Sequence, residues 1–214
     1  MKEAIKSYHM FLPRVWVRWC IYILYPLFVI GGIYALNRYA TYFAFVCIGL
    51  TCSMVVMVEY MLDTYVFLGI AARDTNRLEY LKTSSKGLPL LKKALFTDAV
   101  RRFLSTGIIV AGVFFVLRGD FEFTLKGCVF CIAILYLMME LGFMITRFST
   151  NVWLNLVMLY ILMTIACVVG IYVSLWNIQI WQLLLSGIAD VGIAVLGNKL
   201  IFKRAEESFY DKEF

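Results

Sequence analysis

Four carboxylic side chains lie within or next to long apolar stretches, and they are the residues of this sequence best placed to do chemistry. They are Glu59, Asp63, Glu140 and Asp190. A charge inside a lipid bilayer costs at least about 2.5 kcal/mol on insertion scales, so such a side chain usually faces the interior of a helical bundle. Two roles stay open: a pathway for a proton or substrate, or interhelical ion pairs, with Arg101 or Arg102 as partners near the inner membrane surface.

The sequence offers few of the residue patterns that enzymes and metal sites need. It has no HExxH, GxSG or GxxxxGK[ST] pattern, and its single histidine is His9. Cys128 and Cys131 form half of a metal or redox pattern, without a second pair or a histidine cluster. The six cysteines instead suit small buried apolar positions: Cys20, Cys47, Cys52, Cys128, Cys131 and Cys167. We therefore expect no catalytic residue, no metal site and no cofactor in this chain.

The elements that must position the four acids are membrane-spanning helices. Of the 214 residues, 63% are hydrophobic and only 16% are charged, whereas soluble domains carry nearer a quarter charged residues. The apolar residues form continuous blocks of about 20, which is the length of a helix that crosses the bilayer core. A transmembrane barrel would instead show short alternating segments. The sequence predicts an all-α membrane protein.

Six spans are expected, and they divide the chain into three parts. Residues 1–15 alternate charged and apolar positions, which predicts an interfacial (elbow) helix lying along the membrane. Residues 16–203 form the transmembrane domain, and 204–214 form a charged cytoplasmic tail. The six spans are predicted at 16–34, 40–72, 103–117, 124–146, 152–173 and 178–200. The second is longer than a helix needs to cross the bilayer core, so it is expected to project past the inner surface. Residues 73–102 form the one long polar segment between spans.

The basic residues indicate the orientation. Of the 20 lysines and arginines, only Arg38, Arg118 and Lys126 fall on the side opposite the termini, which leaves 17 on the side of the termini. Basic residues concentrate on the cytoplasmic side of membrane proteins. We therefore expect both termini and the 73–102 segment in the cytoplasm, with the protein in a bacterial-type cell membrane. Because the positive charge is sorted by membrane side, the net charge of +6 does not indicate nucleic-acid binding.

The segment after the second span resembles the ABC-2 type permeases, which are transmembrane subunits of ABC transporters. The similarity lies in Leu78, Glu79, Tyr80, Leu81, Ser84, Ser85 and Lys86. In that family the corresponding run forms a cytoplasmic coupling helix between spans two and three. This chain departs from the pattern because the expected proline after the helix is absent, and Pro89 comes a few residues later.

The resemblance implies a permease that works with a separate ATP-binding cassette ATPase subunit, which would hold ATP and Mg. The residues it implies for contact with that subunit are Arg77, Leu78, Glu79, Tyr80, Leu81 and Ser84. It also implies a homodimer, with the second and fifth spans as the central seam. Small and polar positions in those spans permit close packing there or a pathway: Gly49, Thr51, Ser53, Thr164 and Gly170.

The expected function is export of amphipathic or antimicrobial peptides, drugs or lipids, since the outer loops are too short to dock an external binding protein. Two alternatives stay open. One is a membrane-embedded lipid-modifying enzyme that uses Glu59 and Asp63 at the inner interface. The other is a membrane assembly factor that transports nothing.

Overall fold

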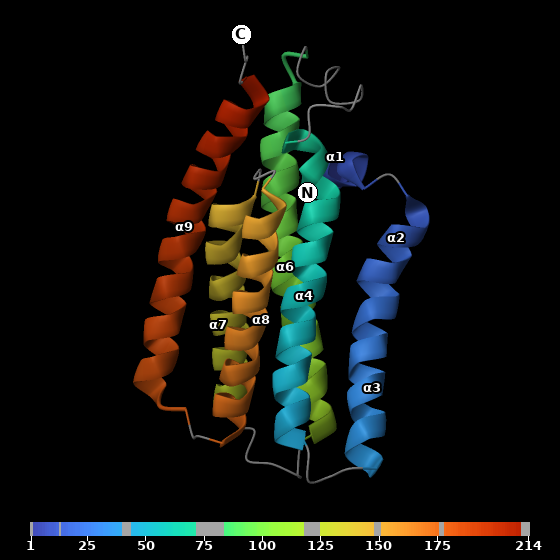
Figure 1. The fold of residues 1–214 in the computed structure, drawn as a ribbon, viewed down its shortest axis with the longest axis vertical. Helices are drawn as coiled ribbons and strands as arrows, with labels where there is room; N and C mark the ends of the chain where they lie inside the picture. The colour runs from blue at the N-terminus through green and yellow to red at the C-terminus, as the bar shows by residue number, and fades with distance from the viewer. Residues whose placement is uncertain are drawn as a thin grey trace.

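The chain folds into a bundle of long helices in the computed structural model, which describes residues 2–12, 14–39, 44–71, 84–117, 125–147, 151–175 and 178–210 (Figure 1). The helices are α1 (Lys2–Phe11), α2 (Val15–Trp19), α3 (Tyr25–Tyr39), α4 (Ala44–Ala71), α6 (Gly87–Leu117), α7 (Leu125–Thr146), α8 (Val152–Leu175) and α9 (Ile180–Tyr210). Within the described residues, six helical stretches are long and apolar enough to cross a membrane. The expectation of an all-α, multi-pass membrane protein is confirmed.

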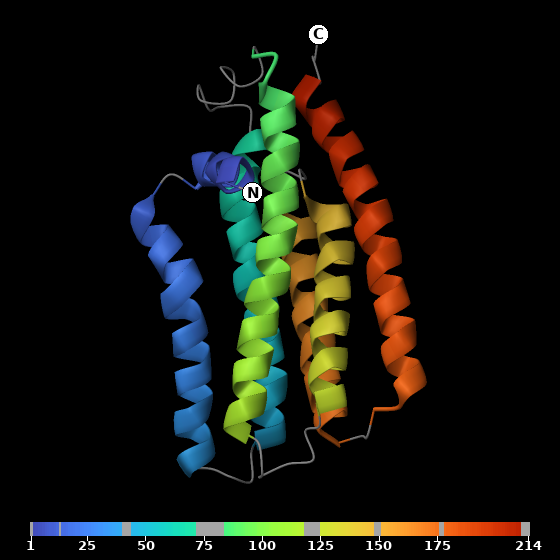
Figure 2. The same cartoon turned by 180° about the vertical axis from the view of Figure 1, so that it is seen from behind.

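The long helices run side by side, and the short helix α1 lies across them near one end (Figures 1 and 2). That end also holds the last residues of α4, the first residues of α6 and the last turns of α9. α1 packs against α6, and Tyr8 and Leu12 are fully buried there. We call this end of the bundle the α1 end.

The first span contains a local change of helix type next to its proline. A π-helical segment, Cys20–Leu24, joins α2 to α3, and Pro26 follows within the first turn of α3. Proline has no N–H and its ring clashes with the preceding turn, so a straight α-helix is disrupted just before it. The interruption before Pro26 takes the form of this widened turn.

The third span begins much earlier than its charges suggest. We expected it at residue 103, but α6 starts at Gly87 and its candidate span covers all of Gly87–Leu117. Pro89 falls in the first turn, where a missing N–H costs no hydrogen bond. Leu91 and Leu95 are buried in a cluster with residues of α1 and α4. Residues 87–102 are therefore the first part of a long helix within the bundle, and α6 begins before the predicted start of the third span.

The last helix also extends beyond its predicted end. α9 continues to Tyr210, so residues 204–210 are helical rather than a separate tail. Arg204 donates hydrogen bonds to the carbonyl oxygens of Met144 and Ile145 at the end of α7, where a helix leaves carbonyls without partners. Glu206 forms an ion pair with Lys92 of α6. The extension thus connects α9 to α6 and α7 at the α1 end.

α4 and α8 pack closely through small residues of the same chain. A Cβ atom placed on Gly170 would lie 2.8 Å from the Cα atom of Gly49, and the Ser53 hydroxyl donates to the Met163 carbonyl at 2.8 Å. Gly49, Ser53 and Gly170 are therefore occupied by packing within one bundle. Of the two alternatives expected for these positions, close packing or a pathway, the structure shows close packing at these three.

The cysteines follow the apolar pattern, with one contact that the spacing did not predict. Cys47, Cys52, Cys128 and Cys131 are buried and all six cysteines carry free thiols. The sulfur atoms of Cys52 on α4 and Cys131 on α7 lie 3.6 Å apart. Cys20 is exposed on the surface of the first span, so the expectation of burial is wrong at this position.

Candidate functional site

A buried ionic cluster lies between α4, α6 and α7 toward the α1 end of the bundle. It brings together four carboxylates and three guanidinium groups, each no more than 7% exposed. We call these residues the ionic cluster: Glu59, Asp63, Asp98, Arg101, Arg102, Glu140 and Arg147. Such charges are stable in an apolar interior only when they are paired and hydrogen-bonded.

Asp98 occupies the centre of the ionic cluster because its two oxygens reach all three arginines. Its Oδ1 accepts hydrogen bonds from Arg101 at 3.1 and 3.2 Å. Its Oδ2 accepts one from Arg147 at 2.9 Å and lies 3.3 Å from Arg102. Asp98, Arg101 and Arg102 share one helix face at i, i+3 and i+4, and Asp98 is fully buried.

Glu59 and Arg101 join α4 to α6 through a two-pronged contact. Arg101 donates from Nη1 to Oε1 at 3.2 Å and from Nη2 to Oε2 at 2.6 Å. The planar guanidinium group matches a carboxylate in this geometry, which gives a stronger and more directional contact than a single hydrogen bond. The two helices are thereby fixed relative to each other at this level.

Arg102 and Arg147 extend the ionic cluster to α7. Arg102 lies 2.9 Å from Glu140 and 3.7 Å from Asp63, and its guanidinium carbon lies 4.2 Å from the ring centre of Phe143. Arg147 forms an ion pair with Asp63. Aromatic faces attract cations, and this contribution grows when water is excluded.

Tyr8 of α1 covers the ionic cluster from the side of the crossing helix. Its ring centre lies 5.9 Å from the guanidinium carbon of Arg101, and the side chain is fully buried. Burial, with a further contribution from the charge of Asp98, raises the pKa of the Tyr8 phenol above its ordinary value. Tyr8 therefore stays neutral and packs over the ionic cluster.

The structure separates the four acids that the sequence singled out. Glu59, Asp63 and Glu140 lie in the ionic cluster, and Arg101 and Arg102 are among their partners. The interhelical ion pair is thus the alternative that the structure supports for these three.

Asp190 does not belong to the ionic cluster. It lies on α9, where it is partly buried, and its Oδ1 has no hydrogen-bond partner among the described residues. Its role as a pathway residue stays a prediction.

Asp98 and Arg147 belong to the ionic cluster but were not predicted as site residues. Asp98 falls in the polar 73–102 segment, and Arg147 directly follows the predicted fourth span, 124–146. The spacing of Asp98, Arg101 and Arg102 places them on one helix face, and this pattern could have indicated the ion pairs from the sequence. The separation of seven residues between Glu140 and Arg147, about two helical turns, is another such pattern.

The predicted ATPase contacts fall mostly outside the described residues. The contact residues outside the described part of the chain are Arg77, Leu78, Glu79, Tyr80 and Leu81. Ser84 is described, and it lies in the turn before α6, where its Oγ accepts from the Lys86 N–H at 3.3 Å. The predicted coupling helix therefore remains a prediction.

The enzyme alternative required Glu59 and Asp63 to be accessible at the inner interface. Both are ion-paired with arginines and no more than 5% exposed, so neither is free to act on a lipid substrate in this arrangement. No group of residues suited to holding a metal ion occurs in the described part of the chain.

Comparisons with protein-family models, with curated proteins and with solved structures find no match to this chain. The resemblance to ABC-2 type permeases therefore rests on the residues of the 78–86 run and, more loosely, on the predicted arrangement of an interfacial helix, six spans and a charged tail.

Proposed function

We propose that this protein is the transmembrane permease subunit of an ATP-driven ABC exporter and works as a homodimer with separate ATPase subunits. The substrates that fit this class are amphipathic or antimicrobial peptides, drugs or lipids. In this arrangement both termini and the segment between α4 and α6 face the cytoplasm, and the partner subunit holds ATP and Mg.

The observation that carries the proposal is the position of the ionic cluster relative to the predicted coupling segment. Residues 72–86 connect α4 to α6, the two helices that the Glu59–Arg101 contact joins. Asp63 lies about 12 Å along α4 from Ala71, and Asp98 about 17 Å along α6 from Gly87, at 1.5 Å per residue. A force applied to the connecting segment would therefore move α4, α6 and α7 together.

This mechanical role explains why the charges lie within the bundle. An apolar contact is non-directional and permits helices to slide. Charge-assisted hydrogen bonds fix the relative position of the groups that make them. The ionic cluster would serve as the rigid joint through which ATP-driven motion of the partner reaches the membrane.

The need for a second copy follows from the filled interior of one bundle. Buried apolar side chains from α3, α4, α6, α7 and α8 form one continuous core, so a pathway would lie between bundles. In the apolar 18-residue window of each candidate span, 67% of the residues are buried for α4, 22% for α8, and 11% for both the first and the last span. The face toward a second copy would therefore come from α8, α9 or the first span rather than α4.

Affinity purification of the tagged chain from its native membranes tests the proposal. The expected product is a complex with an ATP-binding cassette subunit, because the 77–84 residues would seat in a groove of that subunit. Glu79→Lys should prevent recovery of the ATPase. Glu207→Lys, an equal change of charge in α9, should leave the complex intact.

Recovery of the wild-type chain without any ATPase, under gentle extraction, would contradict the proposal. Equal recovery of the ATPase with both variants would show that Glu79 does not contact it.

A further inference from the structure

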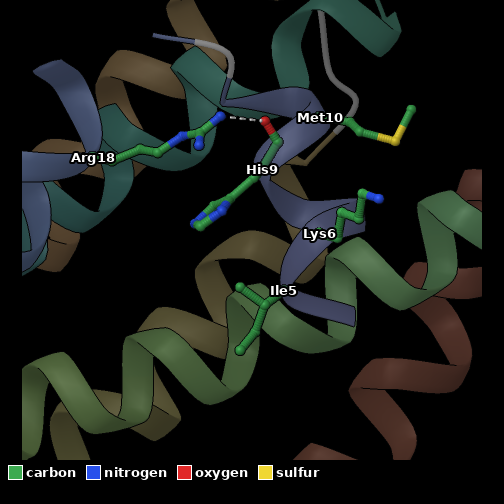
Figure 3. A pocket seen from close by; sticks show the side chains of 5 residues that line it. All are labelled: Ile5, Lys6, His9, Met10 and Arg18. Carbon is green, nitrogen blue, oxygen red and sulfur yellow. Dashed lines mark hydrogen bonds between the residues drawn. The ribbon is translucent and has the colours of Figure 1, made fainter. Parts of the chain in front are cut away.

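A hollow of about 380 Å³ opens between α1 and Arg18, close to the junction with the first span (Figure 3). It combines cationic, imidazole and apolar side chains: Lys6, Arg18, His9, Ile5 and Met10. No acidic side chain is among these lining residues. We call this hollow the elbow pocket.

Arg18 is held in the elbow pocket by the end of α1. Its Nε donates to the Leu12 carbonyl at 2.8 Å, and its Nη2 donates to the His9 carbonyl at 3.0 Å. The second of these bonds is drawn in Figure 3. These contacts satisfy carbonyl groups at a helix end and fix the guanidinium group in place. The positive charge is therefore positioned before any ligand arrives, which lowers the cost of binding.

His9 contributes a neutral ring rather than a further charge. Burial and the nearby Arg18 lower the pKa of His9 below its ordinary value of 6.5, so the imidazole is uncharged at neutral pH. Its Nε2 is buried and has no hydrogen-bond partner among the described residues. A neutral imidazole nitrogen can donate or accept one hydrogen bond, depending on its tautomer.

The surroundings of the elbow pocket are those of a membrane surface. Trp16 and Trp19 on α2 are 83% and 58% exposed, and tryptophan concentrates where headgroups meet acyl chains. Ile5 and Met10, which line the pocket, are also exposed. The apolar part of the pocket thus continues into a surface suited to lipid, while Lys6 and Arg18 supply its charge.

We propose that the elbow pocket binds the headgroup of an anionic phospholipid, with Lys6 and Arg18 as the cations that attract its phosphate and with the acyl chains along Ile5 and Met10. The fork of an arginine side chain matches phosphate oxygens, and basic pockets beside transmembrane helices bind anionic headgroups. The bound lipid anchors α1 across the bundle, over Tyr8 and the ionic cluster. A free inorganic phosphate would use the cations but gain nothing from the apolar lining.

Native mass spectrometry of the full chain tests the proposal. The protein is extracted from phosphatidylcholine vesicles with and without phosphatidylglycerol, and the retained lipid is counted. Phosphatidylglycerol should be retained in preference to phosphatidylcholine. Lys6→Gln should lower that retention about fivefold, the change expected for one basic residue near an anionic lipid surface. Lys86→Gln, an exposed cation outside the pocket, should leave it unchanged.

Met10→Asp provides a second variant because it adds a negative charge to the lining at an exposed position. It should lower phosphatidylglycerol retention at least as much as Lys6→Gln. Equal loss with Lys6→Gln and Lys86→Gln would overturn the proposal in favour of general surface attraction. Equal retention of the two lipids, or displacement of the lipid by inorganic phosphate, would also overturn it.

Discussion

Charged residues in the spans of this protein are stabilised by one another, and Asp98 illustrates the principle best. Its carboxylate contacts Arg101, Arg102 and Arg147 in an interior closed to water. Removing one partner of a buried ion pair leaves the others uncompensated and typically costs about 3–5 kcal/mol. An exposed pair of the same types contributes only about 0–1 kcal/mol. The same substitution should therefore have very different effects at buried and exposed acids.

Asp98→Asn should lower the free energy of unfolding by about 3 kcal/mol, because three arginines would lose a negative partner. Glu206→Gln, at the partly exposed pair with Lys92, should lower it by less than about 1 kcal/mol. Denaturation of the purified protein in mixed micelles measures both. Similar losses for the two variants would show that the ionic cluster does not stabilise the bundle.

Sequence reasoning at the residue scale identified three of the four acids of the ionic cluster and two of their three arginines. It did so because a charge among apolar residues is conspicuous. It could not choose between a pathway and an ion pair, since that choice depends on which helices are neighbours. Asp98 was missed because Arg101, Arg102 and the lysines before them made its surroundings resemble a solvated segment.

At the scale of elements, helix ends were harder to predict than helix existence. The excess length of α4 past Glu59 was predicted and is confirmed to Ala71. The start of α6 was misplaced because residues 87–102 carry four basic residues, which suggested solvent. Packing decides instead: Leu91 and Leu95 are buried against α1 and α4, and the neighbouring arginines find carboxylate partners. Tertiary contacts of this kind are not visible in a single segment.

The α4–α8 contact gives a second prediction, since a side chain has no space where Gly170 meets Gly49. Gly170→Ala should lower the free energy of unfolding by about 1–3 kcal/mol, the usual cost of overpacking. Gly187→Ala is the matched control because a Cβ atom there meets nothing within 4 Å. It should leave stability unchanged or raise it slightly. Equal destabilisation in thermal unfolding would contradict the close packing of α4 and α8.

At the scale of the whole molecule, the α1 end gathers the features that matter for the proposed function. The crossing helix α1, the last residues of α4, the first residues of α6 and the extension of α9 all lie there (Figure 2). Six spans were predicted and six candidate spans are present in the described residues. The positive charge distribution predicts that this end faces the cytoplasm.

Labelling of single introduced cysteines tests that orientation. Ser85→Cys, in the turn before α6, should react with a membrane-impermeant thiol reagent only from the cytoplasmic side. Gln179→Cys, exposed between α8 and α9, should react only from the opposite side. Native cysteines are replaced by serine in both proteins. Labelling of both positions from one side would rule out the proposed topology.

The central claim is that this bundle converts ATP-driven motion of a partner into transport, and ATP hydrolysis by the purified complex tests it most directly. The complex recovered with the wild-type chain, reconstituted in lipid nanodiscs, should hydrolyse ATP at a rate that differs from that of the isolated ATPase. Glu79→Lys should abolish this difference, while Glu207→Lys should preserve it. A rate identical with and without the wild-type chain would contradict the account.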